Sequence, residues 1–329
     1  MVNPLRPHIY RWSGSLLVGI LLSPLHCFAT SVVAFRTAEE IVIAADSRAT
    51  ASNDLSIHIS TCKIRQMNSV FVASAGFMFS PATGFSIEQL LSTSFKPNVS
   101  IRQGVRSFER AVIKPMLNQM IWERKRDIGI FRREYEGKET LQIVFATIEN
   151  SVPVLLFRSF KSETVNGKLT FHLARKIDCP GDCTGDVRYV PLGEGEAIAA
   201  YMEQNPRSWF RGTFVETAKF FVSLEIEDKP EFVASPIDVL RLTKDGAEWI
   251  QKKQDCPNRD PSGHREKRKE PSRAAGKAGG YEQQEWIDVS LIFLVGTFRS
   301  ALAPQTCIGG PVQREGLGYS RGFQLAKRI

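Results

Sequence analysis

The sequence is poor in histidine and has no apolar run of the length that crosses a membrane, and these shortages exclude several classes of protein. Its 329 residues hold 5 histidines and 6 cysteines. Cys179 and Cys183 flank Pro-Gly-Asp without a matching second pair, so we expect a disulfide across a tight turn, with a metal site as the alternative. The apolar runs 16–22 and 287–298 are shorter than the roughly 20 residues of a transmembrane helix. We therefore expect no metal, no other cofactor and no stable membrane span.

Positive charge is unevenly placed, which argues against a nucleic-acid partner. The formal net charge is +8, but residues 251–280 hold nine Lys or Arg and four Asp or Glu. The rest of the chain is nearer neutrality, and the basic stretch has little apolar material for a core. Gly-Glu-Gly at 193–195 is not a phosphate loop, because the later glycine and lysine of such loops are missing. We expect residues 254–329 to be a basic, largely disordered extension.

The first 29 residues have the three parts of a secretory signal peptide. Two arginines and a histidine precede the apolar run 16–22, and Cys-Phe-Ala at 27–29 has the small-residue ending of a cleavage site. Cleavage after Ala29 would leave Thr30 with a free α-amino group. We therefore expect an exported protein, periplasmic or secreted.

Two short β-branched runs, 29–35 and 41–45, flank a polar turn and predict a hairpin that is buried on both faces. Asp46 stands at the end of the second strand, and Lys63 opens the next strand. An isolated charge is costly to bury. We therefore expect the carboxylate of Asp46 and the ammonium of Lys63 to pair at the ends of adjacent core strands, as part of a site or as a structural ion pair.

A threonine at an N-terminus has the chemistry of a nucleophile. Its hydroxyl is weak alone, but its own α-amine can act as the general base, and such amines titrate near about 7.7–8.0. A nearby lysine ammonium lowers the pKa of that amine further, and an aspartate holds the lysine in place. The sequence therefore predicts that Thr30, Asp46 and Lys63 converge in a site. The alternative for Thr30 is an ordinary strand residue that follows a signal peptide.

Thr-Ser-Val-Val at 30–33 and Ala-Ala-Asp-Ser-Arg-Ala-Thr at 44–50 resemble the start of a proteasome β-type subunit. The chain is similar to an exported, bacterial-type member of the proteasome-like N-terminal-nucleophile (Ntn) hydrolases. This resemblance implies an α+β fold, specifically a four-layer αββα sandwich. It also implies that the backbone N–H of one glycine donates to the oxyanion. The residues that it assigns to catalysis are Thr30, Asp46 and Lys63, with Gly76 as the oxyanion donor.

The resemblance also assigns a substrate pocket, lined by Ala49, Arg65, Ser74 and Met78. Alternation along the strand puts Arg65 on the same face as Lys63. Its guanidinium would then favour an acidic substrate side chain through a charge-assisted hydrogen bond. The alternatives are that Arg65 turns to solvent or pairs with a neighbouring acid.

Some supporting residues depart from the family pattern. Glu194 stands where the family has a serine. A second motif, near 233–238, lacks its serine and glycines, so Asp228 or Glu231 would have to replace its aspartate. We expect supporting roles for Arg48, Glu194 and Asp228. For Glu194, a solvated helix N-terminus is the alternative, since that position favours acids.

The remaining pattern predicts blocks of helices and strands. Helices are expected after Ser86 and Ser100, the second kinked or divided at Pro115, and later at 193–203 and 213–224. Strands are expected at 141–146, 152–157, 169–173, 187–190 and 237–242, the last closing the body before Gly246. We expect three parts: a signal peptide at 1–29, an Ntn-hydrolase domain at 30–253 and the extension at 254–329.

Three functions are compatible with these expectations. The first is an exported, endopeptidase-like threonine hydrolase that cleaves peptide bonds through an acyl-enzyme on Thr30, with a peptide or protein as substrate. The second is a small-amide amidohydrolase of the same fold, since one fold can host several activities. The third is a catalytically silent, proteasome-like binding or assembly protein. A homo-oligomer is a further expectation.

Overall fold

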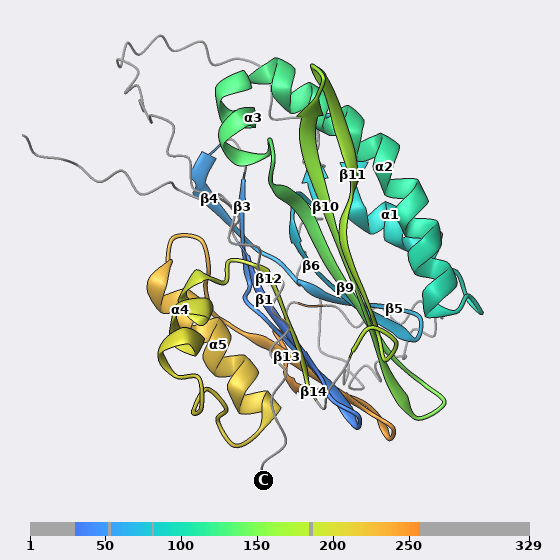
Figure 1. The fold of residues 1–329 in the computed structure, drawn as a ribbon, viewed down its shortest axis with the longest axis vertical. Helices are drawn as coiled ribbons and strands as arrows, with labels where there is room; N and C mark the ends of the chain where they lie inside the picture. Colours follow the sequence, from blue (N-terminus) through green and yellow to red (C-terminus); the bar gives the residue numbers. More distant parts are fainter. Residues whose placement is uncertain (1–29, 52–53, 81, 184–186, 255, 257–329) are drawn as a thin grey trace, which may run out of the picture. The chain divides into compact units, whose positions relative to one another are not determined.

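The computed structural model describes residues 30–254 and Cys256, apart from 52–53, 81 and 184–186 (Figure 1). The expected signal peptide and most of the expected extension lie outside the described residues. The described part is an α+β body of antiparallel sheets and helices.

One five-stranded sheet has the order β12-β1-β2-β13-β14, and all neighbours in it are antiparallel. Its strands are β1 (Ser31–Arg36), β2 (Glu40–Ala45), β12 (Arg188–Gly193), β13 (Asp238–Thr243) and β14 (Gly246–Gln251). The expected hairpin of β1 and β2 is confirmed, and all its strand residues except Glu40 are buried, because small and β-branched side chains fill both faces. The expectation that the body closes before Gly246 is wrong. β14 is an edge strand whose residues are all exposed or half-buried, so it lacks an apolar alternation.

The second five-stranded sheet has the order β11-β10-β9-β6-β5. Its strands are β5 (Ile64–Met67), β6 (Val70–Gly76), β9 (Glu139–Glu149), β10 (Val152–Val165) and β11 (Lys168–Cys179). Lys63 precedes β5 of this sheet, whereas Asp46 follows β2 of the other sheet. The expectation that the two residues end adjacent strands is therefore wrong. Two hairpins without a sequence prediction lie outside these sheets, namely β3 (Arg48–Ala51) with β4 (Asp54–Ser60) and β7 (Phe79–Ser80) with β8 (Phe85–Ser86).

Three helices pack on the second sheet, namely α1 (Ile87–Ser94), α2 (Ile101–Arg126) and α3 (Ile128–Glu134). α1 and α2 begin after Ser86 and Ser100 as expected, and the side chains of both serines cap their helices by accepting hydrogen bonds from the first turn. The expectation that Pro115 divides the second helix is wrong, since α2 runs through it. Val112 and Met116, on either side of the proline, are fully buried. This packing offsets the hydrogen bond that proline cannot donate.

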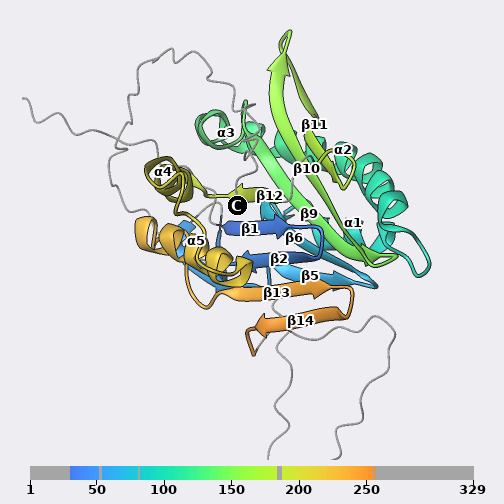
Figure 2. The same cartoon turned by 60° about the horizontal axis from the view of Figure 1, so that its bottom comes forward.

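The other two helices, α4 (Glu196–Gln204) and α5 (Phe214–Asp228), pack on the first sheet. α5 begins where the sequence predicts, with the hydroxyl of Thr213 accepting from the N–H of Glu216 at 3.1 Å. In Figures 1 and 2, α1 and α2 lie beside the second sheet, and α4 and α5 lie beside the first.

Three apolar clusters connect these elements. The first joins α1, α2 and α3 to the second sheet and includes Phe108 and Phe145. The second is shared by strands of the two sheets and includes Ile43 of β2 and Phe157 of β10. The third joins α4 and α5 to the first sheet and includes Phe221. Burial of large apolar side chains in all three places stabilises the body.

Two disulfides join described cysteines. One links Cys179 to Cys183, the pair that the sequence suggests. The other links Cys62 to Cys256, which are 194 positions apart and have no sequence signal for pairing. It keeps Cys256 in the body, beyond the expected domain end at residue 253. A deletion from residue 255 onward would therefore remove one partner of a disulfide.

Candidate active site

Thr30, Asp46 and Lys63 meet at one ammonium group. The Nζ of Lys63 donates to Thr30 Oγ1 at 2.7 Å and to Asp46 Oδ1 at 2.7 Å. All three residues are buried, with 9%, 0% and 7% of their surfaces exposed, respectively. A lysine held in this way bridges a hydroxyl and a carboxylate that lie 16 positions apart in the chain. The convergence that the sequence predicts is therefore present in the structure.

Backbone hydrogen bonds position the threonine and the carboxylate. Thr30 lies directly before β1, and its carbonyl accepts from the N–H of Glu194 at 2.7 Å. The next residue, Ser31, donates its N–H to Asp46 Oδ1 at 2.9 Å, and its carbonyl accepts from Asp46 N–H at 3.1 Å. The start of β1 is thus tied to the end of β2 and to the end of β12. Thr30 cannot shift along the sheet without breaking these bonds.

The second carboxylate oxygen of Asp46 is held by two further N–H groups. Asp46 Oδ2 accepts from Arg48 N–H at 2.9 Å and from Ala234 N–H at 3.4 Å. Ala234 belongs to the segment whose side-chain motif departs from the family pattern. In this chain the segment supports the aspartate through its backbone, which no side-chain motif could reveal.

Burial sets the protonation behaviour of Lys63. Loss of solvent lowers the pKa of its ammonium to about 8, although the charge and the hydrogen bond of Asp46 act in the opposite direction. The positive charge of Lys253 also contributes to this lowering of the pKa. The ammonium therefore titrates near neutral pH, which suits a group that exchanges or shares protons with a nucleophile.

Two glycines permit close backbone packing, one next to Thr30 and one at the end of β6. Gly193 has a φ of +74°, and a Cβ there would lie 2.0 Å from the Thr30 carbonyl oxygen and 3.2 Å from the Cβ of Ala75. The end of β6 and the start of β1 therefore converge on Gly193. Gly76, next to Ala75, has a φ of +100°, and a Cβ there would lie 2.3 Å from the carbonyl oxygen of Thr140. Only glycine fits both positions without strain. The oxyanion role of Gly76 stays a prediction.

The three expected supporting residues lie in different places. The guanidinium of Arg48 donates to the carbonyl of Pro230. Glu194 is buried, and its carboxylate pairs with Lys229. The alternative of a solvated helix N-terminus for Glu194 is therefore wrong. Asp228 is exposed at the end of α5.

Glu225 is a buried acid near the site that the sequence reasoning missed. Its Oε1 accepts from the N–H of Ile198 at 2.9 Å, at the start of α4. Burial raises the pKa of Glu225 to about 7, and the charges of Glu194 and Asp228 add to the rise. A signal was available, since Glu225 follows the buried Phe221 by one helical turn.

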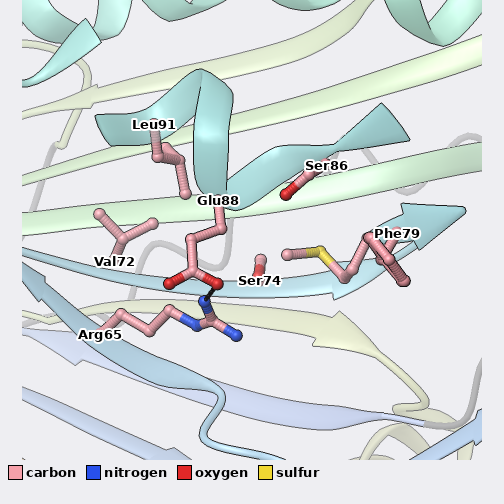
Figure 3. A pocket seen from close by; sticks show the side chains of 8 residues that line it. Arg65, Val72, Ser74, Phe79, Ser86, Glu88 and Leu91 are labelled. Atoms are coloured by element: carbon pink, nitrogen blue, oxygen red, sulfur yellow. Dashed lines mark ion pairs between the residues drawn. The ribbon is translucent and has the colours of Figure 1, made fainter. Parts of the chain in front are cut away.

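A cavity lies between β5, β6 and α1 and includes three of the four predicted substrate residues. Its lining consists of Arg65, Val72, Ser74, Met78, Phe79, Ser86, Glu88 and Leu91 (Figure 3). Ala49 does not belong to that lining. Figure 3 shows Arg65 directed to the carboxylate of Glu88, with which it forms an ion pair. Of the possibilities for Arg65, pairing with a neighbouring acid is therefore the one that occurs.

The described residues form neither a metal-binding cluster nor a membrane-spanning helix. No group of three or more His, Cys, Asp or Glu that could hold a metal ion is present in the described part of the chain. No helix among those described is long and apolar enough to cross a membrane.

Comparison with known proteins gives similar structures only. No protein-family model and no curated protein matches the chain. Among solved structures, a Gly-1 mutant of Anbu from Hyphomicrobium sp. strain MC1 is 19% identical with a TM-score of 0.43, and the match covers 69% of this chain and 89% of that one. Anbu from the same strain is 18% identical with a TM-score of 0.42, with 68% and 86% covered. Anbu from Yersinia bercovieri, described as an ancestral beta-subunit, is 18% identical with a TM-score of 0.43, with 68% and 88% covered. A likeness at this level assigns no function.

Proposed function

We propose that this chain is an exported hydrolase that cleaves peptide bonds through an N-terminal threonine, Thr30, and an acyl-enzyme intermediate. One observation carries the proposal: the ammonium of Lys63 donates to both the hydroxyl of Thr30 and the carboxylate of Asp46 at 2.7 Å. A structural ion pair needs only the lysine and the acid. The second contact, to a hydroxyl at the residue after a predicted cleavage site, suits an activated nucleophile.

The nucleophile becomes complete only when residue 30 is the first of the mature chain. While Ala29 is attached, the nitrogen of Thr30 is an amide and cannot accept a proton. After cleavage that nitrogen is an amine, which can take the proton of Oγ1 as the oxygen attacks the substrate carbonyl. Lys63 stabilises the developing negative charge on Oγ1 and disfavours protonation of the amine, while Asp46 holds Lys63 in place.

Two chemical steps then follow. Attack by Oγ1 gives a tetrahedral oxyanion, for which the N–H of Gly76 is the proposed donor. When the C–N bond breaks, the amine of Thr30 returns its proton to the leaving nitrogen and an ester to Thr30 remains. Water, deprotonated by the same amine, attacks the ester; as the bond from the acyl carbon to Oγ1 breaks, the amine returns that proton to Oγ1 and the acid leaves. No cofactor is required by this scheme.

We further propose the four-layer αββα architecture of the Ntn hydrolases. The three apolar clusters support it, because they join helices to one sheet, the two sheets to each other, and the other sheet to the remaining helices. The proposed parts are a signal peptide at 1–29, the hydrolase domain from Thr30 and a basic C-terminal extension, with a peptide or protein as substrate. Assembly into a homo-oligomer belongs to the same proposal.

Intact-mass analysis of the exported chain, with and without a peptide epoxyketone, tests the proposal. This probe forms a ring with the hydroxyl and the amine of an N-terminal threonine, so the mass must correspond to a chain starting at Thr30 and must increase by one probe. Thr30→Ser should keep part of the reaction and Thr30→Ala none. A mature terminus elsewhere, or a chain that stays unmodified, would contradict the mechanism and favour the silent binding protein. Reaction with the probe but hydrolysis only of small amides would favour the amidohydrolase.

A further inference from the structure

The residues that follow β14 contact the loop that carries Lys63. The Nζ of Lys253 donates to Ser60 Oγ at 3.2 Å and also to the carbonyl of Thr61. Cys256 forms a disulfide with Cys62, the residue directly before Lys63. We call Lys253 and Cys256 the anchor residues. Both anchor residues are buried.

The anchor residues are themselves fixed to the strand beside Asp46. The backbone N–H of Lys253 donates to Asp238 Oδ1 at 2.8 Å, and the N–H of Cys256 donates to the Lys253 carbonyl at 3.3 Å. Asp238 is fully buried at the start of β13, where it is paired in register with Ala45, the neighbour of Asp46. One short stretch of chain therefore connects the strand next to Asp46 with the loop before Lys63.

We propose that Lys253 is a positioning residue for Lys63: it fixes the loop that carries Lys63 and places a second positive charge beside it, and the Cys62–Cys256 disulfide holds Lys253 in place. This inference depends on the proposed function for its catalytic meaning. No part of the Thr-Asp-Lys arrangement requires a second lysine, so the role is additional to that mechanism. Lys253 acts through Lys63 and does not touch the nucleophile.

The charges that face the two lysines are consistent with this role. Asp46 faces Lys63 and raises the pKa of its ammonium, whereas burial and the charge of Lys253 lower that pKa to about 8. Asp238 faces Lys253 and has a pKa raised by burial, which the charges of Lys253 and Lys252 counteract. Because Asp238 neutralises part of the charge on Lys253, two ammonium groups can be accommodated in the same buried region.

The test uses the full exported chain and four variants. NMR of a chain labelled with ¹³C-lysine follows the titration of Lys63, whose signal is assigned as the one missing from Lys63→Met. In Lys253→Met this titration should move to higher pH by on the order of half a unit. The alkaline limb of the rate of epoxyketone modification, where Lys63 loses its proton, should move in the same direction. The rate at pH 7 should fall about 10-fold, because the loop that carries Lys63 is held less firmly. Lys253→Arg should restore both values. Lys252→Met is the matched control, because it removes a neighbouring charge that lies over the ring of Trp249, and it should leave both values near those of the unaltered chain.

The outcomes separate the inference from the proposed function. If Lys253→Met lowers the melting temperature but leaves the Lys63 titration where it was, Lys253 is merely structural and the inference is wrong. That titration decides the inference even if the unaltered chain fails to react with the epoxyketone, in which case the proposed function is what fails. If Lys253→Met does not fold, the Lys63 titration is measured in the double variant Cys62→Ser, Cys256→Ser, which keeps both lysines. An unmoved Lys63 titration there would overturn the role given to the disulfide.

Discussion

Replacing Lys63 by methionine removes the ammonium that joins Thr30 to Asp46 while keeping most of the side-chain volume. Breaking a buried ion pair by removing one partner typically costs about 3–5 kcal/mol, because the other charge stays buried. Here the carboxylate of Asp46 keeps three backbone donors, from Ser31 and Arg48 at 2.9 Å and from Ala234 at 3.4 Å. Hydrogen bonds to a charged group retain much of its stabilisation. We therefore expect a loss of unfolding free energy below that range, about 2–3 kcal/mol.

Chemical denaturation at pH 7 measures this loss, and the rate of epoxyketone modification measures the effect on chemistry. Without the ammonium, the charge that develops on Oγ1 has no positive partner, and we expect the rate to fall at least about 100-fold. Lys168→Met is the matched control, because Lys168 is exposed at the start of β11. It should change stability by less than about 0.5 kcal/mol and leave the rate unchanged.

Two results would refute this reasoning in different ways. If Lys63→Met is as stable as the unaltered chain, the buried pair of Lys63 and Asp46 contributes nothing to the folded state. If it is destabilised as expected but reacts with the probe at the original rate, the pair is structural and Thr30 does not depend on it.

Three further predictions concern other parts of the chain. Burial raises the folded-state pKa of Glu225 from 4.5 to about 7, so the folded state holds a proton that the unfolded state loses, and stability should fall as pH rises from about 4.5 to 7. In denaturation experiments above pH 7, Glu225→Gln should be more stable than the original chain by up to about 3 kcal/mol, and the two should not differ near pH 4. In peptide-library profiling, the original chain should show a weak preference for acidic substrate side chains, and Arg65→Ala should lose it only in part, because Glu88 already pairs with the guanidinium of Arg65. Identical profiles for the two chains would mean that Arg65 does not contribute to substrate preference. Deletion of residues 263–329 should leave the melting temperature unchanged, whereas a deletion that also removes Cys256 should cost about 2–5 kcal/mol through loss of a disulfide.

Elements with a strong local signal could be predicted from the sequence. The hairpin of β1 and β2 has continuous apolar strands around a polar turn, and the helices predicted near Ser86, Ser100 and Thr213 begin within a residue of those positions. The meeting of Lys63 with Asp46 follows from the cost of burying either charge alone. These features depend on short stretches of chain or on a single pairing rule.

The missed features depend on contacts between distant parts of the chain. β14 has no apolar alternation, because it is an edge strand with exposed side chains. The Cys62–Cys256 disulfide and the contacts of Lys253 join segments more than 190 positions apart. Pro115 has a strong local preference against a helix interior, yet tertiary packing of α2 overrides it. Local preference fixes none of these outcomes.

The geometry of the candidate site depends on how the two sheets pack. Thr30 and Asp46 adjoin strands of the first sheet, whereas Lys63 precedes a strand of the second, so the ammonium makes an ionic connection between sheets as well as a contact with the nucleophile. Small apolar side chains from both sheets, such as Ala45 and Ala75, lie in the cluster between them and permit close approach. A substitution that widens this contact would lengthen the distance from Lys63 to Thr30 without altering either residue. Stability of the inter-sheet core and activation of the hydroxyl are for this reason properties of one set of contacts.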